Sequence, residues 1–412
     1  MALEVTAVRG YTAPSFESVA GAAERALLER GEEGLAVAAY LRGEKVVDIW
    51  AGTADGRPWS EDTLAVIFSC TKGVLALCAQ LLYDRGLLDI EAPVTRYWPE
   101  YGVNGKESTT VRHLLTHQAG VITFPRYWDV IGLNGEGLED WELITRKLAE
   151  APPSFAPGTQ TLYHALTMGF LVGEVIRRID GRTPGRLFAD EVAGPLGLDV
   201  YIGIPPEAEG RAASVLPPPV VDKSALTPDQ LRIKEMYEAM GAGARAALRA
   251  GKAIELEALP YAAGFVHPDR ADTDSHLVDL LNRPEIRRAE LPAGNGIATA
   301  RGLARMYAML TEGGELEGTR IVSPASIEVF NTPAVMMRPD LPAICLGYHR
   351  MVPLFKGPSA TAFGHGGAGG SLAFADLERG LSFGFVHNRM RNEPVGTAAD
   401  LVRAVYECLD SA

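Results

Sequence analysis

Ser69 and Lys72 are the two residues whose types and spacing most directly suggest covalent chemistry. They frame the motif Ser69-Cys70-Thr71-Lys72 at the start of a helix expected over 71–88, so both side chains should share one helix face. Burial disfavours a charged lysine, and the neutral amine can then take the serine proton. This predicts a Ser-Lys nucleophile. The structural alternative is a helix-capping serine beside an exposed lysine, and the apolar neighbours AVIF and GVLALC count against it.

Two further segments carry possible chemistry. Tyr163 leads an apolar stretch expected to be helical over 162–181, where a tyrosine is usually a core residue. The glycine-rich FGHGGAGGS (363–371) leads into a strand, and its glycines would let a substrate approach backbone N–H groups closely. A bent strand entry is the structural alternative there. The three signals together say far more than any one of them.

Together these motifs resemble those of class C β-lactamase-like serine hydrolases, and within them the family VIII carboxylesterases, over roughly 34–388. That family has a Ser-x-x-Lys motif, a Tyr-x-Asn or Tyr-x-Ser motif and a Lys-Thr-Gly-type strand. The matching segments here are Ser69-Cys70-Thr71-Lys72, Tyr163-His164-Ala165 and His365-Gly366-Gly367, with VRHLLTHQAG (111–120), FAPGTQTLYHALTMGFLVGEVI (155–176) and GNGIATARGLARM (294–306) as supporting stretches.

The resemblance implies a role for each residue. Ser69 would be acylated, and Lys72 would hold Ser69 and Tyr163 in their working protonation states. Tyr163 would be a general base or proton relay between Ser69 and the leaving group. The backbone N–H groups of Ser69 and Ala368 would form the oxyanion hole. His365 would stand where β-lactamases carry the lysine of their third motif.

Two departures from the β-lactamase pattern move the expected substrate towards esters. Ala165 offers no side-chain amide to a β-lactam, and His365 binds a carboxylate less firmly than lysine because it is neutral or only partly charged at pH 7. Further candidates for substrate contact are His164, Gly366, Gly367 and Trp128. Trp128 lies in FPRYWDVIG (124–132), which forms either a wall of the acyl pocket or a surface loop.

The resulting hypothesis is a carboxylesterase that acts on small-molecule esters through an acyl-enzyme, without metal or cofactor. An acyltransferase that passes the acyl group to an amine or alcohol is the nearest alternative. A β-lactamase or D-peptidase fits less well. A non-catalytic ligand-binding relative would need none of Ser69, Lys72 and Tyr163.

The remaining histidines suggest little chemistry. His113 and His117 are spaced as zinc ligands on one helix would be, but no third ligand stands nearby, so a supporting or structural role is expected. His349 and His387 fall within expected strands and should be packed. Cys70 is interpreted as a small buried residue behind Ser69 rather than as a rival nucleophile.

Strand-like segments lie at both ends of the chain and helices in the middle. The strands expected are 35–41 and 46–52 near the start, and 346–352, 369–377 and 381–390 near the end. This predicts an α+β fold with a central antiparallel sheet built from both termini, flanked by helices, and an inserted, mainly helical domain. The resemblance implies the β-lactamase/transpeptidase type.

The expected domain division follows from that pattern. Residues 1–68 and 291–412 would form the sheet-containing domain, and 69–290 the mainly helical one. Within the latter, 204–290 is irregular and is either an insertion that covers the substrate cleft or a surface elaboration.

The charge composition limits the kinds of binding partner that can be expected. The 412 residues contain 39 Lys and Arg against 52 Asp and Glu, a net charge of -13. Such a surface repels phosphate backbones and anionic lipid, so nucleic-acid and membrane partners are not expected. The sequence shows neither a secretory signal nor the roughly 20-residue apolar run of a membrane span. With four scattered cysteines, this favours a reducing bacterial cytoplasm. The oligomeric state stays open.

Overall fold

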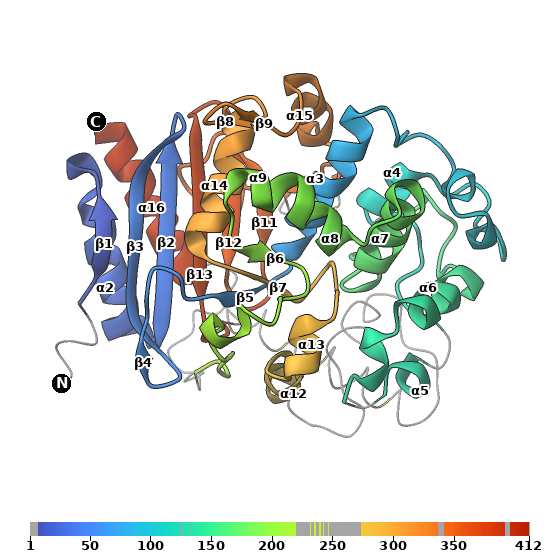
Figure 1. Cartoon of the computed structure of the whole chain (residues 1–412), viewed down its shortest axis with the longest axis horizontal. Coiled ribbons are helices and arrows are strands. Elements are labelled where there is room, and N and C mark those ends of the chain that lie inside the picture. The colour runs from blue at the N-terminus through green and yellow to red at the C-terminus, as the bar shows by residue number, and fades with distance from the viewer. Residues whose placement is uncertain are drawn as a thin grey trace.

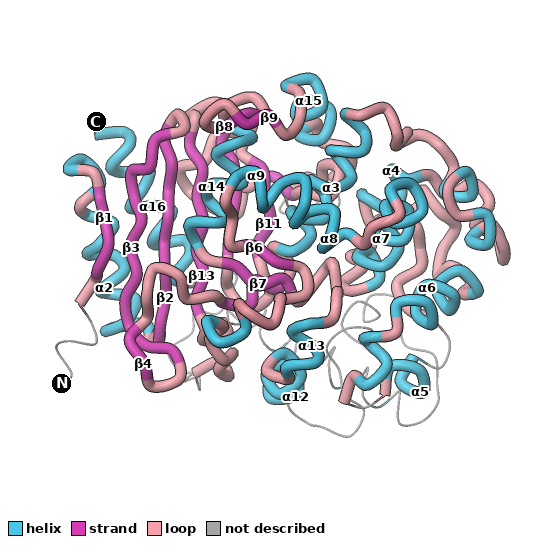
Figure 2. The backbone as a smooth tube through the Cα atoms, in the orientation of Figure 1, coloured by secondary structure: helices cyan, strands magenta, loops and turns pink. Residues whose placement is uncertain are grey.

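The computed structural model describes most of the chain. The described residues are 7–124, 127–132, 134–219, 273–336, 342–391 and 396–411, with five single positions between 231 and 246. Figure 1 shows a sheet-rich part that contains both labelled termini, beside a mainly helical part. Figure 2 shows the same division by secondary structure.

The main sheet joins the two ends of the chain, as predicted. Its order is β1-β3-β2-β13-β12-β11-β10, with β4 attached to β3, and every pair is antiparallel. Strand β13 pairs with β2 along its whole length, from Leu381 opposite Leu41 to His387 opposite Leu35. The strands are β1 (Arg9–Thr12), β2 (Gly34–Leu41), β3 (Glu44–Ala54), β4 (Arg57–Pro58), β10 (His349–Arg350), β11 (Phe363–Gly366), β12 (Leu372–Asp376) and β13 (Leu381–His387).

Helices cover both faces of this sheet. On one face, α2 (Ser18–Arg30) and the C-terminal α16 (Thr397–Ser411) share a core cluster with side chains of β2 and β13. On the other, α14 (Ala300–Thr311) packs against β2, β12 and β13 (Figure 1). Because the sheet is covered on both faces, all seven residues of β13 are buried, including the polar Ser382 and His387.

A second, smaller sheet leads into the site. Its order is β5-β7-β6, formed by β5 (Ala65–Phe68), β7 (Gly296–Ala298) and β6 (Val200–Tyr201). The apolar AVIF of β5 is wholly buried and runs into α3 (Thr71–Asp84), whose residues from Thr71 to Leu82 are all buried. Ser69 therefore lies in the turn between a buried strand and a buried helix.

The described middle of the chain is mainly helical. Strand β7 also carries β6, so it ties this region to the sheet-rich part. The elements here and around α14 are α4 (Val111–Leu115), α5 (Tyr127–Ile131), η4 (Glu136–Glu139), α6 (Trp141–Glu150), α7 (Thr167–Asp180), α8 (Pro184–Phe188), the π-helical turn η5 (Ala189–Ala193), α9 (Gly194–Leu196), α12 (Thr273–Leu281), α13 (Pro284–Arg288), α15 (Pro324–Asn331), and the small hairpin β8 (Glu315–Leu316) with β9 (Thr319–Arg320). Single 3₁₀ turns are η1 (Pro14–Phe16), η2 (Val94–Arg96), η3 (Pro99–Tyr101) and η6 (Glu209–Arg211).

Two expected helices are shorter than the sequence pattern indicates. The helix expected over 110–121 ends at Leu115, and His117 follows in a left-handed conformation with φ +59°. The helix expected from 162 begins at Thr167, so Tyr163 lies in the irregular segment before it. In both places backbone outside the helix is held by contacts around His117, which local propensity does not encode.

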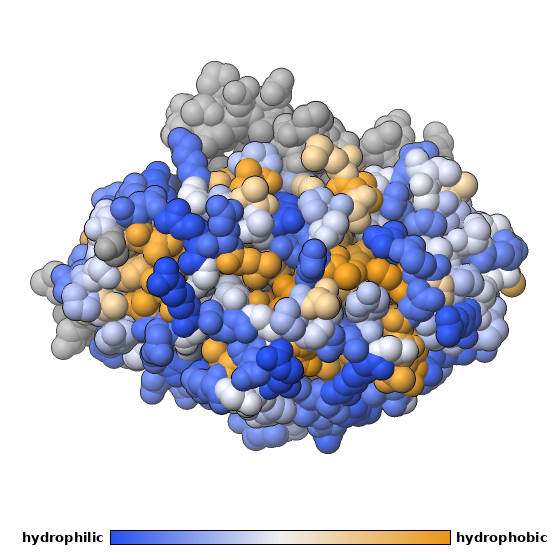
Figure 3. All heavy atoms as spheres, turned by 90° about the horizontal axis from the view of Figure 1, so that it is seen from above, coloured by the Kyte–Doolittle hydropathy of each residue, from blue (hydrophilic) through white to orange (hydrophobic). Residues whose placement is uncertain are grey.

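Much of the molecular surface seen from one side is hydrophilic. Figure 3 shows hydrophilic residues over much of one face, with separate hydrophobic patches between them. No helix among the described residues is long and apolar enough to cross a membrane.

Candidate active site

Ser69 occupies a strained turn. The preceding residue, Phe68, has φ +48°, a left-handed conformation that is unfavourable for a bulky aromatic residue. This conformation turns the chain sharply from β5 into α3. Ser69 is 8% exposed, so its hydroxyl lies at the edge of the core rather than on the open surface.

Lys72 is fully buried and points at Ser69. Its Nζ lies 3.3 Å from Ser69 Oγ and 2.8 Å from the carbonyl oxygens of both Ala165 and Ala293. Burial lowers the pKa of Lys72 to about 7. A neutral amine in this position donates its two N–H bonds to the carbonyls and turns its lone pair to the Ser69 hydroxyl. The geometry therefore suits a lysine that accepts the serine proton.

Tyr163 packs beside this lysine. The Lys72 Nζ is 4.7 Å from the Tyr163 ring centroid. Burial raises the pKa of Tyr163 above its usual value, and the neighbouring Ser69 side chain opposes that shift. Tyr163 thus keeps its phenol proton near neutral pH. Tyr163 can therefore donate its phenol proton, whereas Lys72 is the group that can lose its proton and act as a base.

Three imidazoles surround the Tyr163 ring. Their ring centroids lie 4.7 Å (His117), 6.2 Å (His349) and 6.4 Å (His365) from that of Tyr163. His117 also holds the segment in place, because its carbonyl accepts from Leu162 N–H and its Nδ1 accepts from His164 N–H. Below we call Tyr163 with these three histidines the imidazole cluster.

Burial keeps the imidazole cluster uncharged. It lowers the pKa of His117 and His365 well below the usual value, and that of His349 to about 4, with Lys72 acting in the same direction. His365 lies in β11 and packs against His349, with 4.4 Å between the ring centroids and the rings tilted by 32°. Its Nδ1 lies 2.7 Å from Gly366 O. These shifts agree with the expectation that His365 carries little charge near pH 7.

The glycine-rich loop after β11 packs directly against the nucleophile turn. A Cβ on Gly367 would stand 2.6 Å from the carbonyl oxygen of Ile67, and one on Gly369 2.2 Å from the Phe68 ring. Only glycine fits at such distances. Ala368 lies exposed between these glycines. Within the described residues, the N–H groups of Ser69 and Ala368 have no hydrogen-bond partner, as an oxyanion hole requires.

Behind this loop lies a buried carboxylate, Glu32. It accepts from Arg391 Nε at 2.9 Å and Thr397 Oγ1 at 2.6 Å, and its Oε2 is 2.9 Å from His387 Nδ1. Burial alone would raise the pKa of Glu32, but His387 and Arg391 lower it further than burial raises it. The guanidinium of Arg391 is thus held by Glu32, and the backbone N–H of the same residue donates to Gly369 O at 2.8 Å, which anchors the loop that carries Ala368.

Cys70 has the structural role that the sequence predicted. Its thiol donates to the His365 carbonyl at 3.0 Å and lies 3.4 Å from the Ser371 carbonyl, so it ties α3 to β11 and β12. Burial raises the pKa of Cys70, which keeps the thiol protonated and a poor nucleophile. All four cysteines are free and buried.

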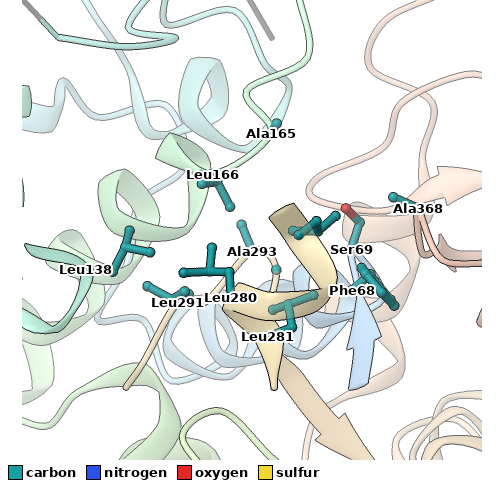
Figure 4. A pocket seen from close by; sticks show the side chains of 12 residues that line it. Phe68, Ser69, Leu138, Ala165, Leu166, Leu280, Leu281, Leu291, Ala293 and Ala368 are labelled. Carbon is teal, nitrogen blue, oxygen red and sulfur yellow. The ribbon is translucent and has the colours of Figure 1, made fainter. Parts of the chain in front are cut away.

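A pocket opens beside Ser69. The space there measures about 430 Å³ when the open solvent at its mouth is counted, and among the described residues that line it Ser69 alone has a polar side chain. Figure 4 shows Ser69 and Ala368 at one end and Leu138 and Leu291 at the other. The lining residues are Phe68, Ser69, Leu138, Ala165, Leu166, Leu277, Leu280, Leu281, Leu291, Ala293, Gly294 and Ala368. Below we call this the leucine pocket.

The other predicted site residues are placed as follows. His164 is buried next to Tyr163, with its Nδ1 2.6 Å from Leu162 O, and Gly366 is exposed beside His365. Trp128 lies in α5, but its side chain is outside the described residues. Much of 204–290 is also outside them, although one of its described helices, α12, lines the leucine pocket.

Sequence reasoning was wrong about where two histidines lie. His113 and His117 do not share a helix, because α4 ends between them and His113 caps its start together with Thr110. The prediction that His349 would simply be packed missed its place beside Tyr163. Among the described residues, no three His, Cys, Asp or Glu side chains are grouped as metal ligands.

Known proteins resemble this chain over most of its length. The sequence model of a family described as Beta-lactamase matches residues 20–407. Esterase/beta-lactamase LipL of Mycobacterium tuberculosis is 36% identical over 400 residues, which are 95% of this chain and 85% of that protein. Esterase EstB of Burkholderia gladioli is 37% identical over 194 residues, covering 42% of this chain and 48% of that protein.

Solved structures agree in fold. A family VIII carboxylesterase superposes with a TM-score of 0.80 at 32% identity, covering 98% of this chain and 100% of that chain. A penicillin-binding protein homologue from Caulobacter crescentus superposes with a TM-score of 0.79, also at 32% identity and with the same coverage.

Proposed function

This chain belongs to the beta-lactamase family of serine hydrolases, and we propose that it is a carboxylesterase forming an acyl-enzyme on Ser69. The observation that carries the proposal is the position of Lys72. Its Nζ lies 3.3 Å from Ser69 Oγ, and two backbone carbonyls occupy its other donors. Its pKa of about 7 leaves a large share of the amine neutral at physiological pH.

Acylation follows from this arrangement. The neutral Lys72 amine takes the Ser69 proton as Oγ attacks the ester carbonyl, and the N–H groups of Ser69 and Ala368 stabilise the resulting oxyanion. When the tetrahedral intermediate collapses, the C–O bond to the alcohol breaks. Tyr163 gives its phenol proton to the leaving oxygen and regains one from Lys72. Water then attacks the acyl-enzyme by the reverse proton path and releases the acid.

The surroundings of Ser69 favour esters over β-lactams. Ala165 presents a methyl group where a β-lactam needs an amide, and its carbonyl already accepts from Lys72. His365 is kept uncharged by burial, so it offers no firm cation for a carboxylate. A missing hydrogen bond to a charged group costs about 1.5–3 kcal/mol, or roughly one to two powers of ten in rate. Losing both contacts should lower β-lactam turnover by several powers of ten.

The test compares kcat/KM for p-nitrophenyl butyrate and nitrocefin with one enzyme preparation. The proposal expects efficient ester hydrolysis that is lost in Ser69→Ala, and little or no nitrocefin turnover. His365→Lys should raise the nitrocefin rate relative to the ester rate. Nitrocefin turned over as fast as the ester would favour a β-lactamase instead. Repeating the ester assay with added amine or alcohol, and measuring the transfer product, distinguishes an acyltransferase.

A further inference from the structure

An apolar pocket and a group of buried imidazoles lie on different sides of Ser69, and we propose that they select an ester of an apolar acid with an alcohol carrying a second hydrogen-bonding group. The leucine pocket would hold the acyl chain, and the imidazole cluster would hold the alcohol. This inference rests on the proposed esterase function. It adds the substrate class that each half of the site would recognise.

The described residues that line the leucine pocket include no charged side chain. Six leucines contribute from separate parts of the chain, namely Leu138, Leu166, Leu277, Leu280, Leu281 and Leu291. Figure 4 labels all of them except Leu277 and shows Leu280, Leu291 and Leu138 leading away from Ser69. Each methylene buried there gains about 0.8 kcal/mol, close to a four-fold rise in kcat/KM. A charged group at the chain end would instead lose its hydration without finding a partner.

The imidazole cluster has unused hydrogen-bonding capacity. His365 is 3% exposed, and its Nδ1 lies 2.7 Å from a carbonyl that can only accept, so Nδ1 carries the proton and Nε2 is left as an acceptor. This Nε2 is buried and unpartnered, as is Nε2 of the neighbouring His349. Leaving such atoms unpaired costs free energy. A bound hydroxyl group can donate to one ring and accept from the other.

The proposed proton transfer indicates which half of the ester lies in each part of the site. The leaving oxygen must lie within reach of the group that protonates it, which the mechanism assigns to Tyr163. His349 and His365 both lie against the Tyr163 ring. No residue of the imidazole cluster lines the leucine pocket. The alcohol therefore extends towards the imidazoles, and the acyl chain extends the other way, past Ala293 towards Leu138.

The experiment measures kcat/KM on the full chain for paired esters. The alcohol pair is 2-hydroxyethyl hexanoate and methyl hexanoate, and the acyl series is methyl acetate, butyrate, hexanoate and octanoate, with monomethyl adipate as the charged chain. We expect the hydroxyethyl ester to exceed the methyl ester about ten-fold. Rates should rise up to four-fold per methylene until the pocket is filled. Monomethyl adipate should fall at least a hundred-fold below methyl hexanoate.

Matched variants separate the two halves. His349→Phe should bring the hydroxyethyl-to-methyl ratio close to one, whereas His113→Phe, which removes an imidazole outside the cluster, should keep it. Leu138→Ala should shift the preferred acyl chain to greater length. Leu148→Ala removes an equally buried leucine of the same core cluster that does not line the pocket, so it should leave the chain-length profile in place.

The outcomes also separate this inference from the proposed function. If p-nitrophenyl butyrate is not hydrolysed, or is hydrolysed equally well by Ser69→Ala, the esterase proposal fails. If Ser69 hydrolyses that ester but the hydroxyethyl-to-methyl ratio is near one in the native chain, the alcohol assignment is wrong. A chain-length profile that is flat, or monomethyl adipate equal to methyl hexanoate, overturns the acyl assignment.

Discussion

Replacing Lys72 with methionine should stabilise the folded chain at pH 7, and the gain should shrink as the pH rises. Lys72 is fully buried, and burial lowers its pKa from 10.5 to about 7. Between these two values the unfolded chain binds a proton that the folded chain does not. The free energy of unfolding of the native protein therefore rises with pH between 7 and 10.5. At pH 7 this rise has not yet taken place, so the cost of burying Lys72 is still almost fully present.

The size of the effect follows from the two pKa values. Each pKa unit corresponds to about 1.4 kcal/mol. A pH of 7 is 3.5 units below the pKa of the lysine in the unfolded chain, whereas the lysine in the folded chain is half protonated at this pH. Burying Lys72 therefore costs about 4 kcal/mol of folding stability at pH 7. At pH 9 this cost is about 2 kcal/mol. Methionine also loses the hydrogen bonds to Ala165 and Ala293, but this loss is the same at both pH values. The difference between native and variant should thus change by about 2 kcal/mol.

Urea unfolding of native and Lys72→Met protein at pH 7, 8 and 9 measures this change. Lys147→Met, which removes a lysine that is 36% exposed and paired with Glu150, controls for losing a lysine at the surface. A native-to-variant difference that stays constant from pH 7 to pH 9 would refute the reasoning. It would mean that Lys72 is not an amine whose proton is lost on burial, and the proposed base would be wrong.

Three further predictions concern the reaction itself. For a neutral ester, kcat/KM should rise with pH through about 7 as Lys72 loses its proton, which a pH–rate profile checks. Lys72→Ala and Tyr163→Phe should each cost on the order of 10²–10⁴ in rate, and the double variant should lose much less than the product of the two; multiplied losses would show independent action. Glu32→Gln breaks a buried ion pair, so it should cost about 3–5 kcal/mol of stability. It should also lower kcat more than it raises KM, because Arg391 anchors the loop that carries Ala368, whose N–H we propose as part of the oxyanion hole. Glu33→Gln, whose partly exposed carboxylate pairs with a different arginine, should cost under about 1 kcal/mol and spare kcat.

The sequence predicted the sheet and the motif residues because these depend on local pattern. Apolar strands at both ends and helices between them indicated one antiparallel sheet, and β2 paired with β13 confirms it. Ser69 and Lys72 were singled out by their spacing at the start of a helix, and Lys72 Nζ lies 3.3 Å from Ser69 Oγ, although Ser69 itself stands in the turn before α3.

The parts that could not be predicted depend on contacts distant in sequence. His349 reaches Tyr163 only because the short β10 pairs with β11, which carries His365. Glu32 is linked to the loop that carries Ala368 through Arg391, which lies 359 positions further along the chain. The carbonyl oxygens that hold Lys72 belong to Ala165 and Ala293, and backbone acceptors leave no signal in residue type. The leucines of α12 belong to the stretch 204–290, which the sequence pattern showed only as irregular, and it is the fold that places them in the pocket beside Ser69.

The central claim is that Ser69 carries the acyl group. The direct measurement is mass spectrometry of the protein after rapid acid quenching during turnover of p-nitrophenyl butyrate, and after labelling with a fluorophosphonate. The account predicts one butyryl or phosphonyl adduct, on the peptide containing Ser69, and no adduct in Ser69→Ala. An adduct on any other residue, or labelling that persists in Ser69→Ala, would contradict it.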